Sequence, residues 1–146
     1  MHPYPHRYQV TARGGPLGSV PIASAGLPDM HTQPPPEFDG PGGAWSPETL
    51  LVAAVADCYV LSFRAVAHFA KFPWERLECA VEGTLDRAAG STRFTAFHTR
   101  ATLTVPAGGD VAKAQELLLR AEKVCLVSNS LIGERHLETT VLETPS

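Results

Sequence analysis

The sequence predicts an α+β fold with a largely antiparallel sheet and one long buried central helix. Three observations support this prediction. Nine of the thirteen prolines fall between Pro3 and Pro41, so the first third of the chain cannot be helical. Residues 50–70 form a mainly apolar run without proline, and residues 77–105 alternate between apolar and polar side chains. A length of 146 residues suits a single domain, residues 1–146, with a core of its own.

Residues 1–45 are expected to form an arm of strands and loops. Arg7 to Arg13 alternates as a strand, and the Gly-Gly-Pro of residues 14–16 forms a turn. Gly18 to Ala25 is a second strand, placed at a sheet edge because it contains proline. Residues 33–43 are rich in proline and glycine and predict an irregular loop.

Residues 46–72 carry the signals of a long central helix. Ser46 suits the N-cap position and Pro47 the first helical position. Glu48 lies in the first turn, where its charge interacts favourably with the helix dipole. Pro73 ends the helix.

This helix is apolar around most of its circumference. We expect one broad side to carry the apolar residues Leu51, Ala54, Val55, Cys58, Leu61, Ala65 and Phe69. Asp57, Arg64 and His68 interrupt the run, which favours a core helix over a membrane span. A small sheet covers only one side of such a helix. We therefore expect a second copy of the chain to cover the rest, in a homodimer.

Alternation and periodicity predict the remaining elements. Residues 77–105 form a strand pair with a turn near residues 87–91. Residues 110–125 form a second helix, capped by Asp110, whose apolar face ends at Cys125. Residues 136–143 alternate as a final strand.

Composition excludes several classes of protein. The formal net charge is −3, with 12 Lys and Arg against 15 Asp and Glu, so the chain lacks the positive stripe that nucleic acids require. The N-terminus lacks the basic-then-apolar plan of a signal peptide, which makes the cytoplasm the expected location. Three cysteines are an odd number and do not make a disulfide framework. Thiol chemistry would then take place in a reducing compartment.

Cys58 and Cys125 lie on the two predicted helices and meet if these helices pack together. Each is also consistent with a buried cysteine that acts as a small apolar residue, and Cys79, on the inward face of a strand, fits that role best. A nucleophilic thiol needs a cation or hydrogen-bond donor that lowers its pKa. Arg13 is a better candidate for that cation than Arg64, which faces away from Cys58 on the same helix. Arg13 also fits a solvated arginine at a strand end.

Glu48 and Cys58 are ten residues apart on one helix, so about 15 Å of helix axis separates them. Glu48 therefore has two interpretations. It compensates the helix dipole, or it belongs to a site assembled at a dimer interface, where the glutamate comes from the other copy or acts through a bridging arginine.

Two segments, one at each helix cysteine, carry a family pattern. They are Ser46-Pro47-Glu48-Thr49-Leu50-Leu51 with Ala53-Ala54-Val55-Ala56-Asp57-Cys58, and Ala121-Glu122-Lys123-Val124-Cys125-Leu126-Val127-Ser128-Asn129. In this combination the chain resembles the OsmC/Ohr superfamily of osmotically inducible and organic hydroperoxide resistance proteins, from about residue 40 to its end. The resemblance implies an OsmC-like fold and an intertwined homodimer with its two long helices back to back.

The resemblance also implies a thiol peroxidase that reduces organic hydroperoxides and needs no cofactor. Cys58 takes the peroxidatic place and forms a sulfenic acid, and Cys125 resolves this acid as a disulfide. A dithiol, typically lipoyl-linked in the hydroperoxide-resistance branch, then reduces the disulfide. Glu48 matches the glutamate that orients an arginine beside the thiolate.

The sequence departs from the family at that arginine. The hydroperoxide-resistance branch places it just after the Gly-Gly of the first turn, where this chain has Pro16. The osmotically inducible branch places it in the loop before the helix, where Gln33 to Asp39 contains no arginine. Arg13 or Arg7 on the first strand is the expected substitute.

Three other functions have weaker support. Six scattered histidines and three cysteines show no metal-ligand spacing. Gly40-Pro41-Gly42-Gly43 lacks the lysine and the spacing of a phosphate-binding loop. The alternative that the missing motif arginine favours is a non-catalytic OsmC-like protein that binds an apolar ligand in the dimer cleft.

Overall fold

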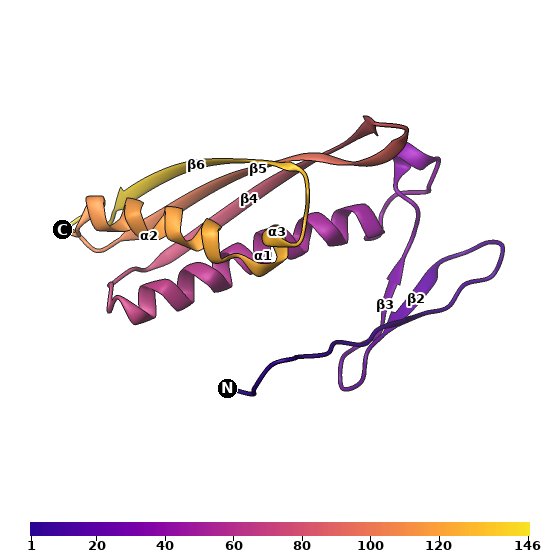
Figure 1. Ribbon diagram of the computed structural model, residues 1–146, viewed down its shortest axis with the longest axis horizontal. Coiled ribbons are helices and arrows are strands. Elements are labelled where there is room, and N and C mark those ends of the chain that lie inside the picture. Colours follow the sequence, from indigo (N-terminus) through magenta and orange to yellow (C-terminus); the bar gives the residue numbers. More distant parts are fainter. The chain divides into compact units, whose positions relative to one another are not determined.

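Long alternating strands and two helices on one face of their sheet organise most of the chain in the computed structural model, which describes residues 1–146 (Figure 1). Contacts gather in two compact units, Met1–Leu51 and Val52–Ser146, within the range predicted to form a single domain. The longest helix, α1 (Pro47–Phe69), begins in the first unit and continues in the second.

The first unit holds a small antiparallel sheet of three strands, β1 (Thr11–Ala12), β2 (Val20–Ala23) and β3 (Met30–Thr32), in that order. The expected first strand is shortened to β1, because the residues before Thr11 are exposed and pair with no other strand. β3 was not predicted, since three residues are too few to show an alternation.

The proline-rich segment before α1 is folded back on itself. A 3-10 turn, η1 (Pro36–Phe38), interrupts it, and the Gln33 amide donates to the Trp45 carbonyl at 2.9 Å. A Cβ at Gly40 would lie 1.8 Å from the Pro34 carbonyl oxygen, so only glycine fits there. Close packing of the chain on itself therefore explains Gly40.

α1 begins as predicted. The Ser46 hydroxyl accepts a hydrogen bond from the Thr49 amide at 3.1 Å, which confirms Ser46 as the N-cap. The helix ends at Phe69, three residues before the expected limit of 72. Lys71 adopts a left-handed φ of 52°, and the Phe72 amide donates to the Ala67 carbonyl, as in a Schellman motif.

The core side of α1 differs from the predicted one. The buried residues are Val55, Tyr59, Phe63, Val66 and Ala67. On the predicted apolar side, Leu61 is 48% exposed and Phe69 is 85% exposed, and only Val55 is buried. A helix that is apolar on several sides gives no periodic signal to choose between them. With a mean hydropathy of 1.8, α1 also has the length and composition of a membrane span, a test that core helices pass as well.

The second unit is built on the sheet β4-β5-β6, formed by β4 (Arg76–Ala88), β5 (Ser91–Val105) and β6 (Glu134–Glu143). β4 and β5 are an antiparallel hairpin, as predicted for residues 77–105. β6 starts two residues before the expected 136 and runs parallel to β5. The parallel direction follows from the intervening helix, which carries the chain back to the start of β5.

That intervening helix is α2 (Val111–Val124), followed by the short α3 (Leu126–Asn129). The Asp110 carboxylate accepts a hydrogen bond from the Lys113 amide at 2.9 Å, which confirms the predicted cap. The helix stops at Val124, one residue before the expected limit of 125, because the extended ψ of Cys125, 100°, separates α2 from α3.

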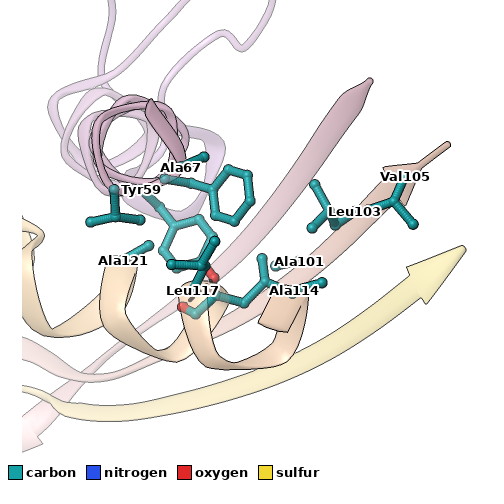
Figure 2. Close-up of a cluster of buried hydrophobic side chains, with 11 residues drawn as sticks. Tyr59, Ala67, Ala101, Leu103, Val105, Ala114, Leu117 and Ala121 are labelled. Atoms are coloured by element: carbon teal, nitrogen blue, oxygen red, sulfur yellow. Dashed lines mark hydrogen bonds between the residues drawn. The ribbon is translucent and has the colours of Figure 1, made fainter. Parts of the chain in front are cut away.

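The core of the second unit lies between the sheet and the two helices (Figure 2). Tyr59 and Ala67 of α1 face Leu117 and Ala121 of α2, with β5 behind them. The whole buried cluster comprises Tyr59, Phe63, Val66, Ala67, Ala101, Leu103, Val105, Ala114, Leu117, Leu118 and Ala121. This packing places the middle of α1, which carries Cys58, against α2, and Cys125 directly follows α2.

Candidate functional site

Cys58 lies in the middle of α1 and is partly exposed. Its Sγ is 3.9 Å from the hydroxyl of Ser62, one helical turn further on. The spacing of four residues puts both side chains on the same side of the helix, so this contact is built into the helix itself.

Cys125 lies at the break between α2 and α3 and is completely buried. Its backbone amide donates to the Glu122 carbonyl at 3.3 Å, and its carbonyl accepts from the Asn129 amide at 2.9 Å. Its thiol donates to the Ser128 hydroxyl at 3.4 Å. The cysteine is thus held on both sides by main-chain hydrogen bonds.

The Cys58 and Cys125 thiols are close enough to interact. Burial is the main cause that raises the pKa of Cys58. The backbone amide of Val127 donates to the Cys58 sulfur and lowers that pKa, whereas the Cys125 thiol raises it and the Ser62 hydroxyl lowers it. The net shift is upward.

The site is a pair of thiols in which two neutral groups, the Val127 amide and the Ser62 hydroxyl, donate to the Cys58 sulfur. The partly exposed Cys58 is open to a reactant, and the buried Cys125 is beside it to form a disulfide. Both donors favour the thiolate, but neither carries a charge. Because burial still dominates the pKa, a cation is needed for a thiol that reacts fast at neutral pH.

Cys79 is half-buried on the inward face of β4 and packs against the core cluster. Burial, followed by the neighbouring Cys125, raises the pKa of Cys79 to about 11. A thiol with such a pKa stays protonated and is a poor nucleophile.

Tyr59 ties α1 to α2 beside the cysteines. Its hydroxyl donates to the Leu118 carbonyl at 2.9 Å in the buried core. Burial, with smaller contributions from Cys79, Glu122 and Cys125, holds the pKa of the Tyr59 hydroxyl well above its usual range.

Glu48 lies in the first turn of α1, within the first unit, and its Oε2 is buried without a hydrogen-bond partner. A buried carboxylate oxygen without a partner is costly, and a guanidinium is the group that best satisfies it. Glu48 is therefore suited to hold an arginine.

Arg13 also lies in the first unit, just after β1, and its amide donates to the Pro21 carbonyl at 3.1 Å. Its exposed side chain lines an open hollow of about 830 Å³, together with Arg7 and Asp29. The structure brings Cys58 and Cys125 together. The link from Arg13 and Glu48 to these cysteines stays a prediction.

Comparison with known families identifies the family of this chain. The model of the OsmC-like protein family matches residues 40–140, which include both helix cysteines. The chain belongs to the OsmC-like protein family.

Known proteins are similar to this chain in sequence and in fold. The uncharacterised protein YmaD of Bacillus subtilis (strain 168) is 30% identical over 112 residues, which cover 73% of this chain and 75% of YmaD. The crystal structure of an organic hydroperoxide resistance protein OsmC from Legionella pneumophila matches with a TM-score of 0.74 and 28% identity, over 94% of this chain and 97% of that one.

An OsmC-like protein of unknown function from Vibrio cholerae has a TM-score of 0.81 at 16% identity, over 92% of this chain and 99% of that one, which shows a common fold. Family membership and the likeness to hydroperoxide resistance proteins support a peroxide-related redox role for this OsmC-like chain.

Two groups of this OsmC-like site donate to Cys58 and were not predicted from the sequence. They are the Ser62 hydroxyl and the Val127 amide. The spacing of four residues between Cys58 and Ser62 was the available signal for the hydroxyl. The sequence held no signal for the Val127 amide, because every residue except proline has the same main-chain donor.

Proposed function

We propose that this OsmC-like chain is a cysteine-based peroxidase that reduces organic hydroperoxides. The observation that carries the proposal is that the buried Cys125 thiol lies near enough to the partly exposed Cys58 thiol to raise its pKa. An apolar setting favours hydroperoxides with an organic tail, since burial of apolar surface contributes about 25 cal/mol per Å².

The reaction has two steps on the protein. The Cys58 thiolate attacks the terminal oxygen of the hydroperoxide, the O–O bond breaks, and Cys58 becomes a sulfenic acid while the alkoxide leaves and takes a proton from solvent. Cys125 then attacks the sulfenic sulfur, a disulfide forms and water leaves. A dithiol reductant, which we expect to be lipoyl-linked and in the cytoplasm, restores both thiols.

Activation of Cys58 is shared between the chain's own donors and a cation. The Val127 amide and the Ser62 hydroxyl already lower the pKa of Cys58 against the larger effect of burial, which raises it. We assign the remaining activation to an arginine oriented by Glu48, whose buried Oε2 has no partner. Arg13 is the first candidate for this arginine and Arg7 the second.

A homodimer completes the proposal. α1 leaves Leu61 48% exposed and Phe69 85% exposed, and a second copy of the chain would cover these apolar residues. Light scattering on the purified protein is expected to give twice the mass of the 15.6 kDa chain. A monomer at micromolar concentration would contradict this part of the proposal.

The test is the consumption of cumene hydroperoxide driven by reduced lipoamide. Cys58→Ser is expected to abolish turnover, and Cys125→Ser to slow it at least tenfold while Cys58 overoxidises. Cys79→Ser is the matched control and is expected to keep most of the activity. If the fully reduced wild type shows no turnover, the chain is instead a non-catalytic OsmC-like protein that binds an apolar ligand. The raised pKa of Cys58 would be consistent with that result, because it keeps the thiol protonated.

A further inference from the structure

β6 carries one partly buried charged side chain on the face that it turns toward the helices. Its outward residues Glu134, His136 and Glu138 are exposed, and its inward residues alternate with them and are partly buried. The first of these inward residues is Arg135, with 28% of its side chain exposed. A charged side chain on an inward face needs partners there.

The partners of Arg135 are all near the end of α2. One terminal nitrogen, Nη1, donates to Asn129 Oδ1 at 2.8 Å, and the other, Nη2, donates to the Glu122 carbonyl. Nε lies 3.7 Å from Glu122 Oε1, and that carboxylate side chain is only 27% exposed. Asn129 in turn donates from Nδ2 to the Lys123 carbonyl at 3.0 Å. Two of the last carbonyls of α2, those of Glu122 and Lys123, are thereby satisfied, and a cation lies at the negative end of the helix dipole.

These contacts hold the chain on both sides of Cys125. Glu122 precedes the cysteine by three residues and Asn129 follows it by four. Both are also joined to Cys125 by main-chain hydrogen bonds, from its amide to Glu122 and from Asn129 to its carbonyl. Arg135 therefore fastens the two ends of the segment 122–129 to the start of β6.

The same segment carries the two groups outside α1 that act on the pKa of Cys58. The Cys125 thiol and the Val127 amide, which interact with the Cys58 sulfur, both lie between the two anchor points of Arg135. Cys125 has an extended backbone at the break between α2 and α3, so no continuous helix fixes its position.

We propose that Arg135 is a positioning residue that holds Cys125 beside Cys58 for disulfide formation. This inference rests on the proposed function, in which the Cys58–Cys125 disulfide forms in each turnover. Disulfide geometry is narrow, because the sulfurs must approach to about 2.05 Å with the Cα atoms about 4.4–6.8 Å apart. A segment anchored at both ends reaches this geometry more often than a free one, which raises the effective concentration of one thiol for the other.

The test measures closure of the disulfide without peroxide. The reduced protein, with Cys79→Ala to leave two thiols, is equilibrated in glutathione buffers of increasing oxidised fraction, quenched with acid and alkylated. In the closing step, Cys125 attacks the Cys58 sulfur of the mixed disulfide, the Cys58–Cys125 bond forms and glutathione leaves. The mass of the alkylated chain gives the fraction of closed disulfide and hence the effective concentration.

Arg135→Met is expected to lower this effective concentration about tenfold, because it removes the fork that joins Glu122 and Asn129. Arg135→Lys keeps the charge but not the fork and is expected to recover only part of the loss. Asn129→Ala removes one anchor and is expected to give an intermediate loss. It also tests the inference if Arg135→Met does not fold.

Arg100→Met is the matched control, since Arg100 is also a sheet arginine in an ion pair, 3.0 Å from Glu138, but on the exposed face. It is expected to change the effective concentration less than twofold. The inference would be overturned if Arg135→Met and Asn129→Ala both gave effective concentrations within twofold of the value for Arg100→Met. A protein that closes the disulfide but does not consume hydroperoxide would refute the proposed function and leave the role of Arg135 intact.

Discussion

The Tyr59 hydroxyl donates to the carbonyl of Leu118, and this 2.9 Å hydrogen bond joins two helices whose residues are 59 positions apart. Tyr59 directly follows Cys58, and Leu118 lies two helical turns before Cys125. The bond therefore helps to set the register of the two helices that carry the candidate thiols.

Tyr59→Phe is expected to lower the free energy of unfolding by about 1 kcal/mol, because it removes one buried hydrogen bond and keeps the ring in the core. Urea unfolding followed by circular dichroism measures this loss. Tyr4→Phe, at an exposed position, is the control. A loss below about 0.3 kcal/mol would mean that the Leu118 carbonyl is satisfied without Tyr59.

The neighbours of Cys58 are expected to shift its reactivity in opposite directions. Ser62→Ala removes a donor to the thiolate, so the pKa of Cys58 rises and its alkylation at pH 7 slows roughly twofold. Cys125→Ala removes a thiol that raises that pKa, so alkylation becomes faster. The rate of iodoacetamide labelling of Cys58 against pH, read by mass spectrometry, measures both effects. Shifts of the same sign in the two variants would contradict this account of the site.

Gly83 is expected to tolerate no side chain. A Cβ there would lie 2.8 Å from Val52 Cγ2 of α1 and 3.0 Å from a Phe94 ring carbon. Gly83→Ala should cost about 1–3 kcal/mol of unfolding free energy, because α1 must move off the sheet to admit a methyl group. Gly15→Ala, which meets no atom within 4 Å, is the control. Equal stability of the two variants would show that α1 packs more loosely on β4.

Alkaline pH is expected to destabilise the fold through Cys79. Burial raises the pKa of this thiol to about 11 in the folded protein, against about 8.5 in an unfolded chain. Between these pH values the unfolded state loses its proton first, so the free energy of unfolding falls as pH rises from about 8.5 to 11 and is unaffected by Cys79 below that range. Unfolding curves at pH 7, 9 and 10.5 measure the slope. Cys79→Ala should have a shallower slope, and an identical slope would assign the effect to other groups.

Local signals in the sequence predicted local structure well. Ser46 and Asp110 cap their helices as expected, since a cap depends on residues three positions away. The alternation of residues 77–105 predicted the hairpin of β4 and β5. The expected proximity of Cys58 and Cys125 depended on the two helices packing together, which they do through the core cluster.

Three features needed the tertiary structure. The core side of α1 is the one with Tyr59 and Phe63, and the sequence offered an equally apolar alternative with Leu61 and Phe69. β6 runs parallel to β5, although its alternation fits either direction. Arg135 showed no sign of a role, because its partners Glu122 and Asn129 reach it only after α2 and β6 have packed.

The sequence by itself determined which segments become the long helices and the long strands and which residues are able to do thiol chemistry, because caps, alternation and side-chain type act within a few positions of the chain. Only the tertiary structure decided which thiols face each other and which amide and hydroxyl donate to Cys58. The physical reason is that these contacts depend on how whole surfaces fit together, and a surface of similar apolar residues on several sides of α1 can be packed in more than one way.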